Sequence, residues 1–148
     1  MDILIREIEE RDYPEVTDLL VAELWNNKNN GDNITLFFDK VENDENYSTF
    51  VALFDNKIIG LVSAITFLWA WSEKKNMLIQ GFAVNNESRN RGVGTKLLEY
   101  LEDYAKSINV SGIGLCSDFK RTAAHACFEK NGYSKITQYF GKMLDPIK

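Results

Sequence analysis

The longest pattern in the chain is a set of apolar residues at spacings of three and four, which predicts a helix that packs one face on a sheet. Its members are Val93, Leu97, Leu98, Leu101, Ala105 and Ile108. Just before it, the apolar and β-favouring run Met77–Val84 predicts a strand, and the polar residues from Asn85 to Asn90 predict a turn. A strand, a loop rich in glycine and arginine, and a helix therefore follow one another.

Similar patterns predict the elements on either side. A strand from Ile3 to Glu9 leads to a helix with Asp12 as its N-cap and Pro14 in its first turn, and Trp25 closes that helix. The other predicted elements are a short helix over Ile34–Val41, hairpin strands over Thr49–Phe54 and Ile58–Trp69, a strand over Gly112–Cys116, a helix over Arg121–Asn131 and a closing strand over Tyr133–Met143. This order indicates an α/β fold in which a mixed sheet has helices on both faces.

Composition limits the class of protein. The 148 residues, 45% of them hydrophobic and 26% charged, suit one globular domain over residues 1–148. The formal charge of −5 disfavours nucleic acid and anionic membranes as partners and favours a cationic substrate. With two cysteines and one histidine, no metal site or disulfide framework is expected, and neither a signal peptide nor a long apolar run is present. We therefore expect a cytoplasmic protein.

The loop before the long helix has the composition of an anion site. The first turn of a helix presents unpaired N–H groups and the positive end of the macrodipole, and glycines let an anion approach the backbone. Arg89, Arg91 and Lys96 add local positive charge beside Gly92 and Gly94. A Walker loop is excluded by the order of its residues, and a dinucleotide fingerprint lacks its third glycine. A phosphate site and a solvated turn with a helix cap both remain open from these residues alone.

Two motifs in the expected order resemble the GNAT acetyltransferase superfamily. Arg89-Asn90-Arg91-Gly92-Val93-Gly94 matches the family's Arg/Gln-x-x-Gly-x-Gly/Ala signature. Downstream, the stretch from Arg121 to Tyr133 is similar to the family's late helix and its Glu-Lys-x-Gly-Phe/Tyr turn. The resemblance implies a mostly antiparallel mixed sheet in which the strand ending at Val84 and the strand Gly112–Cys116 splay apart to admit the pantetheine arm of acetyl-CoA.

The same resemblance implies a cosubstrate, a reaction and a set of binding residues. Acetyl-CoA is expected as the acetyl donor, with direct transfer to a primary amine of a small molecule and no covalent enzyme intermediate. An amide at the end of the strand before the loop would polarise the thioester carbonyl. The residues expected to bind acetyl-CoA are Phe82, Ala83, Val84, Arg89, Asn90, Arg91, Gly92, Val93, Gly94, Thr95 and Arg121.

The chain departs from the family at the positions that handle protons. Phe128 stands where many members place a tyrosine acid, and Gln80 stands where some carry a glutamate base. His125 shares the helical stripe of Phe128 and is a candidate for proton transfer, although packing or hydrogen bonding is the simpler explanation for a single histidine. Cys127 has no base partner and is interpreted as a small hydrophobic residue. Water relays to acidic residues are a further route for the amine proton: Asp118, Glu42 and Glu45.

Several alternatives remain for function and acceptor. The segments that shape the acceptor pocket in relatives correspond to Asn26–Asn33, Leu36–Tyr47 and Trp69–Ser72. Two late stretches, Arg121-x-x-Ala124-His125 and Tyr139-Phe140-x-Lys142-Met143-Leu144, are similar to small-molecule acetyltransferases of the aminoalkylphosphonate and aminoglycoside type. The alternatives are a peptide or protein N-acetyltransferase, and an acyl-CoA-binding sensor that has lost proton handling. The aromatic closing strand also suggests a homodimer.

Overall fold

The computed structural model describes residues 1–23, 31–70 and 72–145. The chain forms two compact units, Met1–Leu115 and Cys116–Lys148. Trp25, Trp71 and most of the predicted polar loop Asn26–Asn33 lie outside the described residues. No helix in the described parts of the chain is long and apolar enough to cross a membrane.

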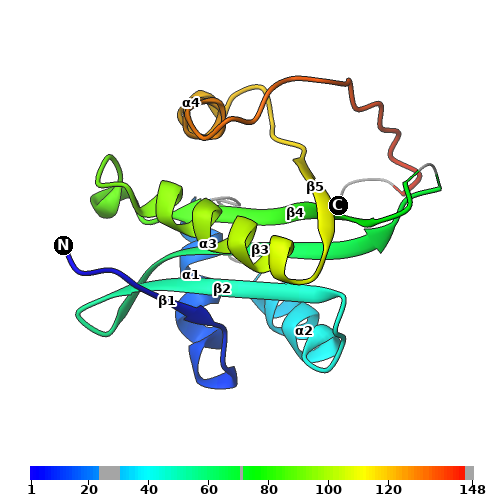
Figure 1. Cartoon of the computed structure of the whole chain (residues 1–148). Helices are drawn as coiled ribbons and strands as arrows, with labels where there is room; N and C mark the ends of the chain where they lie inside the picture. Colours follow the sequence, from blue (N-terminus) through cyan, green and yellow to red (C-terminus); the bar gives the residue numbers. More distant parts are fainter. Residues whose placement is uncertain (24–30, 71, 146–148) are drawn as a thin grey trace. The chain divides into compact units, whose positions relative to one another are not determined.

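The first unit is built on a five-stranded sheet whose spatial order follows the sequence, β1-β2-β3-β4-β5 (Figure 1). Neighbouring strands are antiparallel except for β4 and β5, which are parallel. The strands are β1 Leu4–Glu7, β2 Tyr47–Phe54, β3 Lys57–Leu68, β4 Lys75–Val84 and β5 Val110–Leu115. The mixed, mostly antiparallel α/β sheet expected from the sequence is confirmed.

Helices cover both faces of this sheet because side chains alternate along its central strands. Val51 of β2 and Leu61 of β3 belong to the core cluster formed with α1 (Tyr13–Glu23) and α2 (Gly31–Val41). Their neighbour Phe50 faces the other way and contacts the rings of Tyr100 and Tyr104 of α3 (Val93–Ser107). Burial of apolar side chains on both sides makes the sheet the centre of the unit.

Local sequence explains how the elements are joined. Asp55 and Asn56 have φ values of 50° and 62°, which suit the tight turn between β2 and β3. α1 begins at Tyr13, directly after Asp12 as predicted, but the Asp12 carboxylate bonds to Arg6 and Glu9 instead. Glu9 caps a short 3₁₀ turn, η1 (Glu10–Asp12), in a reciprocal capping box with Asp12, whose carboxylate accepts the Glu9 N–H at 2.8 Å. Helical structure therefore begins a turn earlier than the first apolar residues indicated.

The second unit contains α4 (Thr122–Lys130), which ends before Gly132 with a φ of 90°. The predicted closing strand Tyr133–Met143 is wrong: no strand forms over these residues. Apolar alternation does not make a strand without a partner for its backbone hydrogen bonds. The apolar side chains of this segment are exposed: Ile136, Tyr139, Phe140, Met143 and Leu144.

Candidate functional site

The edge of β4 is open where the sequence predicts a ligand site. The parallel ladder between β4 and β5 runs from Lys75 opposite Val110 to Ile79 opposite Leu115. Beyond Ile79, β4 continues to Val84 and pairs with β3 only, among the residues that the structure describes. From Gln80 to Val84, the side of β4 that is turned away from β3 therefore has no neighbouring strand in the described part of the chain. This opening corresponds to the predicted splay of the two strands.

A β-bulge lies where the opening begins. Ser63 of β3 is opposite Gly81, whereas the next residue, Ala64, is opposite Ile79. Gln80 is thus the extra residue, and its side chain is exposed. A bulge bends a strand and redirects its side chains, and bulges are common beside active sites. The bulge places the predicted candidate Gln80 at the mouth of the opening.

The glycine loop that follows β4 ends in a helix start without a side-chain cap. Gly92 is the N-cap of α3 with a φ of 80°, a left-handed conformation that favours glycine, and it offers no side chain to cap this helix. The backbone bond from the Lys96 N–H to the Gly92 carbonyl measures 3.0 Å, and the first turn carries no acidic residue. The amide groups before Lys96 therefore point out of the helix with the positive end of its dipole. This geometry suits an anionic group such as a pyrophosphate.

The two arginines of the loop have different surroundings. Arg89 donates from Nε to the carbonyl oxygen of Val84 at 3.2 Å, and its Nη2 pairs with the carboxylate of Glu23 at the end of α1. Arg91 is exposed and pairs with no carboxylate in the described ranges. The positive charge of Arg91 is therefore available to a ligand, whereas that of Arg89 is already neutralised.

The sequence prediction missed Glu23. This residue was not distinguished from the other acidic residues of the first helix, and its partner lies 66 positions away. The available signal was a carboxylate near the C-terminal end of a predicted helix, where the macrodipole disfavours negative charge.

The other predicted residues of the opening lie on β4 or α3. Phe82 and Ala83 are buried, with 7% and 3% of their surface exposed, and Ala83 joins the core under α1. Their side chains serve the core. Val93 is also buried, whereas Asn90 is exposed with a φ of 62°.

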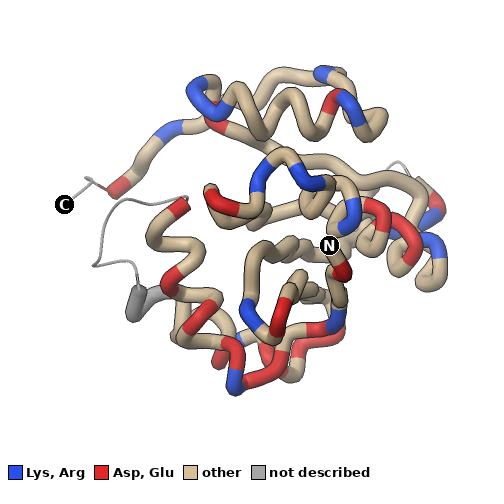
Figure 2. The backbone as a smooth tube through the Cα atoms, turned by 90° about the vertical axis from the view of Figure 1, so that its left-hand side faces the viewer, with Lys and Arg blue, Asp and Glu red and all other residues tan. Residues whose placement is uncertain are grey.

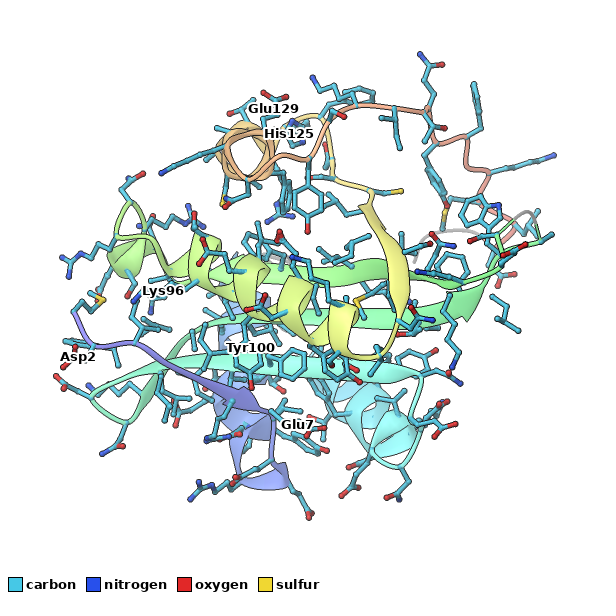
Figure 3. The ribbon with its side chains drawn as sticks, in the orientation of Figure 1. Asp2, Glu7, Lys96, Tyr100, His125 and Glu129 are labelled. Carbon is cyan, nitrogen blue, oxygen red and sulfur yellow. The ribbon has the colours of Figure 1, made fainter. Side chains whose placement is uncertain are left out.

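A separate hollow of about 390 Å³ lies at the opposite edge of the sheet, between β1 and α3. Lys96 and Tyr100 extend from α3 toward it (Figure 3). It is lined by Ile3, Leu4, Ile5, Lys96, Glu99, Tyr100 and Asp103. Its lining contains Lys96 but no other residue of the predicted anion site, so we treat it as separate from the candidate site.

The remaining predicted residues belong to the second unit. Arg121 is the N-cap of α4, and its carbonyl accepts the N–H of His125 at 3.1 Å. His125 is half-buried and lies one helical turn before Glu129 (Figure 3). Phe128 is 5% exposed, and its ring meets that of Tyr133 edge-on, with centroids 6.2 Å apart. Phe128 therefore acts as a core residue of this unit.

Cys127 has the properties of a packed thiol. Burial raises its pKa above the ordinary value, opposed by the charge of Lys130 and a hydrogen bond from the Asn131 amide to Sγ at 3.8 Å. A thiol with a raised pKa is a poor nucleophile at neutral pH. This agrees with its interpretation as a small hydrophobic residue.

Comparison with known proteins identifies the family. The family model for the acetyltransferase (GNAT) family matches residues 4–133. The chain belongs to this family. Its members use acetyl-CoA, and the protein is accordingly an N-acetyltransferase with acetyl-CoA as cosubstrate. The open β4 edge and the uncapped start of α3 are the features of the structure that fit this ligand.

Solved structures share the fold over nearly the whole chain. A GNAT family acetyltransferase from Staphylococcus aureus is 26% identical, with a TM-score of 0.76 over 97% of this chain and 100% of that one. A transcriptional regulator from Bacillus halodurans is 19% identical, with a TM-score of 0.87 over 97% and 100%. The aminoglycoside N-acetyltransferase AAC(6')-Iy, in complex with CoA, is 14% identical, with a TM-score of 0.84 over 96% and 94%.

Proposed function

We propose that this GNAT enzyme transfers the acetyl group of acetyl-CoA directly to a primary amine of a small, positively charged molecule. The observation that carries the proposal is the acidic surface of the first unit. Exposed carboxylates lie on α1, on α2 and in the turn after α2. Figure 2 shows the distribution of acidic and basic residues along the backbone. The exposed carboxylates are Glu15, Asp18, Asp39, Glu42, Asp44 and Glu45.

This surface selects among amine classes by charge. Lys40 is the one basic residue between Ile34 and Tyr47, a segment that contains four of these carboxylates. Clustered negative charge raises the local concentration of cations and repels anions. Polyamines and aminoglycosides therefore suit this surface better than aminophosphonates, which carry a negative group. An aminoglycoside acetyltransferase of the same fold, AAC(6')-Iy, supports the same class.

We propose that the open edge and the helix start share the binding of acetyl-CoA. The amides from Arg91 to Thr95 receive the pyrophosphate, with the charge of Arg91 beside them. The β4 backbone from Phe82 to Val84 binds the pantetheine arm, and an amide there stabilises the oxyanion that develops on the thioester. Backbone groups suit this task because they are fixed by the sheet and need no reorganisation during reaction.

The transfer needs two proton movements. The amine nitrogen forms a bond to the acetyl carbon as the carbon–sulfur bond breaks; the amine loses a proton and the CoA thiolate receives one. His125 is our candidate for the exchange of these protons, and Gln80 is a candidate for orienting the amine or a water. Arg121 is assigned to acetyl-CoA binding together with the loop.

The test is a panel of amines incubated with the protein and acetyl-CoA while free thiol is measured. The panel contains monoamines, diamines, aminoglycosides, aminophosphonates and a lysine-containing peptide. We expect thiol release to be fastest with the polycationic small molecules. Fastest release with the peptide would favour a protein N-acetyltransferase, and CoA binding without amine-dependent thiol would favour a sensor. Either result would refute the proposal.

Three further properties belong to the proposal. The family match runs through both compact units, which supports one functional domain over residues 1–148. The free thiols Cys116 and Cys127 suit the reducing cytoplasm. The exposed apolar side chains after α4 support a homodimer that covers them, and light scattering of the full chain tests this by its mass.

A further inference from the structure

Glu23 makes contacts that no other carboxylate of α1 makes. Its Oε2 accepts from Nη2 of Arg89, and its Oε1 accepts from the backbone N–H of Asn86 at 3.1 Å. The side chain of Glu23 is only 14% exposed. Both oxygens of a largely buried carboxylate are thus committed to the segment between β4 and α3.

Arg89 completes the connection on the other side. Its Nε donates to the carbonyl of Val84, the last residue of β4, at 3.2 Å. One guanidinium therefore ties the end of β4 to the end of α1, and the plane of the group fixes both contacts together. The turn between them is also held by Asn85, whose side-chain oxygen accepts the Glu87 N–H at 2.8 Å.

These contacts lie directly before the candidate pyrophosphate site. Three residues separate Arg89 from Val93, where α3 begins. The position of the Gly92 to Thr95 amides is therefore set from one side by the packing of α3 and from the other by the anchored turn. A loop that is already ordered binds an anion more tightly than a mobile loop, because a mobile loop loses conformational entropy when the anion binds.

We infer that Glu23 is a positioning residue for the acetyl-CoA loop, and that Arg89 acts through its bridge to Glu23 rather than as a pyrophosphate ligand. Arg91 and the helix-start amides then supply the contacts to the phosphates. The inference rests on the proposed pyrophosphate site at Arg91 to Thr95. It assigns a role to a residue outside the family signature.

The two roles for Arg89 predict opposite effects of Glu23→Gln on CoA binding. If Arg89 contacted phosphate, removal of the competing carboxylate would release its charge to the ligand, and CoA would bind equally well or more tightly. If Glu23 positions the loop, the same change weakens CoA binding. We expect the Kd for CoA, measured by calorimetry, to rise by about fivefold or more.

The companion variants complete a double-mutant cycle. Arg89→Gln breaks the same bridge, so it should weaken CoA binding to a similar extent, and the double variant should bind no more weakly than the weaker single variant. Glu10→Gln is the matched control, because Glu10 is an exposed carboxylate of η1, just before the same helix, and the change is the same. Its Kd should remain within about twofold of wild type, which excludes an effect of net charge.

A kinetic measurement separates positioning from general destabilisation. With the panel amine that releases thiol fastest, the KM for acetyl-CoA should rise in Glu23→Gln while kcat stays within about twofold of wild type. Unchanged or tighter CoA binding, or additive effects in the cycle, would overturn the inference. If the wild type itself does not bind CoA, the proposed site fails instead, so the two failures are distinguishable.

A second experiment tests the inference if the Glu23→Gln variant does not fold. The salt dependence of CoA binding is then compared between wild type and Arg89→Gln. Loss of a direct phosphate contact makes binding less sensitive to salt, because one screened ionic interaction is removed. Equal salt slopes support the positioning role, and a shallower slope for the variant overturns it.

Discussion

Gly60 of β3 packs closely against α3, the helix that begins at the candidate site. A Cβ atom at this position would lie 3.0 Å from Cδ1 of Leu97, 3.1 Å from the carbonyl oxygen of Ala83 and 3.3 Å from Cγ1 of Val93. Leu97 and Val93 are buried, with 0% and 1% of their surface exposed, and the Ala83 oxygen belongs to the backbone of β4. Any shift of these groups must therefore be taken up within the packed interior.

Gly60→Ala should therefore destabilise the fold. Forcing one extra carbon into a close-packed core costs about 1 to 3 kcal/mol. For a chain of this size the expected fall in Tm is about 3 to 9 °C. Because Val93 is the first residue of α3, the strain should also displace the helix start and weaken CoA binding.

Gly114→Ala is the matched control for this prediction. Gly114 lies in β5, and an added Cβ there would have no atom within 4 Å. Alanine is favoured over glycine in a strand by about 0.5 to 1 kcal/mol, so this variant should be as stable as wild type or slightly more stable. Guanidinium unfolding followed by circular dichroism measures both variants. Equal stability of Gly60→Ala and Gly114→Ala would refute the packing argument.

The other predictions concern acid stability, the loop and proton transfer. Arg6 hydrogen-bonds both oxygens of the buried Asp12, at 2.6 and 2.9 Å, and this lowers the pKa of Asp12 below its ordinary 3.8. The stabilisation is thus present above pH 3.8 and is lost as the pH falls through the folded-state pKa. Asp12→Asn should therefore lower the free energy of unfolding by about 2 kcal/mol at pH 7 and by less at acid pH. An equal loss at both pH values would contradict this prediction. Gly92→Ala should weaken CoA binding and stability, because the φ of 80° strains alanine by about 1 kcal/mol, and an unchanged Kd would argue against the loop geometry. His125→Ala should lower kcat at least tenfold with little change in CoA affinity if His125 transfers protons, and an unchanged kcat would end that assignment.

The sequence predicted the features that local chemistry determines. Apolar periodicity placed the strand before the loop and the start of α3 at Val93, and glycine at position 92 matches a left-handed φ. Asp55 and Asn56 likewise form the expected turn. Each of these depends on neighbours within a few positions.

Features that depend on distant partners were not predictable in the same way. The bridge between Glu23 and Arg89 joins residues far apart in the sequence, and the bulge at Gln80 is visible only as a shift of register between β3 and β4. Asp12 has the residue type of an N-cap, yet it is the N3 residue of the capping box with Glu9, and its carboxylate also binds Arg6. The segment after α4 has a strand pattern, but a strand also requires a neighbour for its backbone, and the pattern does not show whether one exists.

The most direct test of the account is hydrogen–deuterium exchange of the full chain with and without saturating CoA. Peptides that cover the end of β4, the glycine loop and the first turn of α3, residues 80–96, should exchange more slowly with CoA bound. Peptides that cover β1 should be unchanged, because the hollow at that edge is not the site. Protection at β1 without protection at residues 80–96 would contradict the location of the acetyl-CoA site.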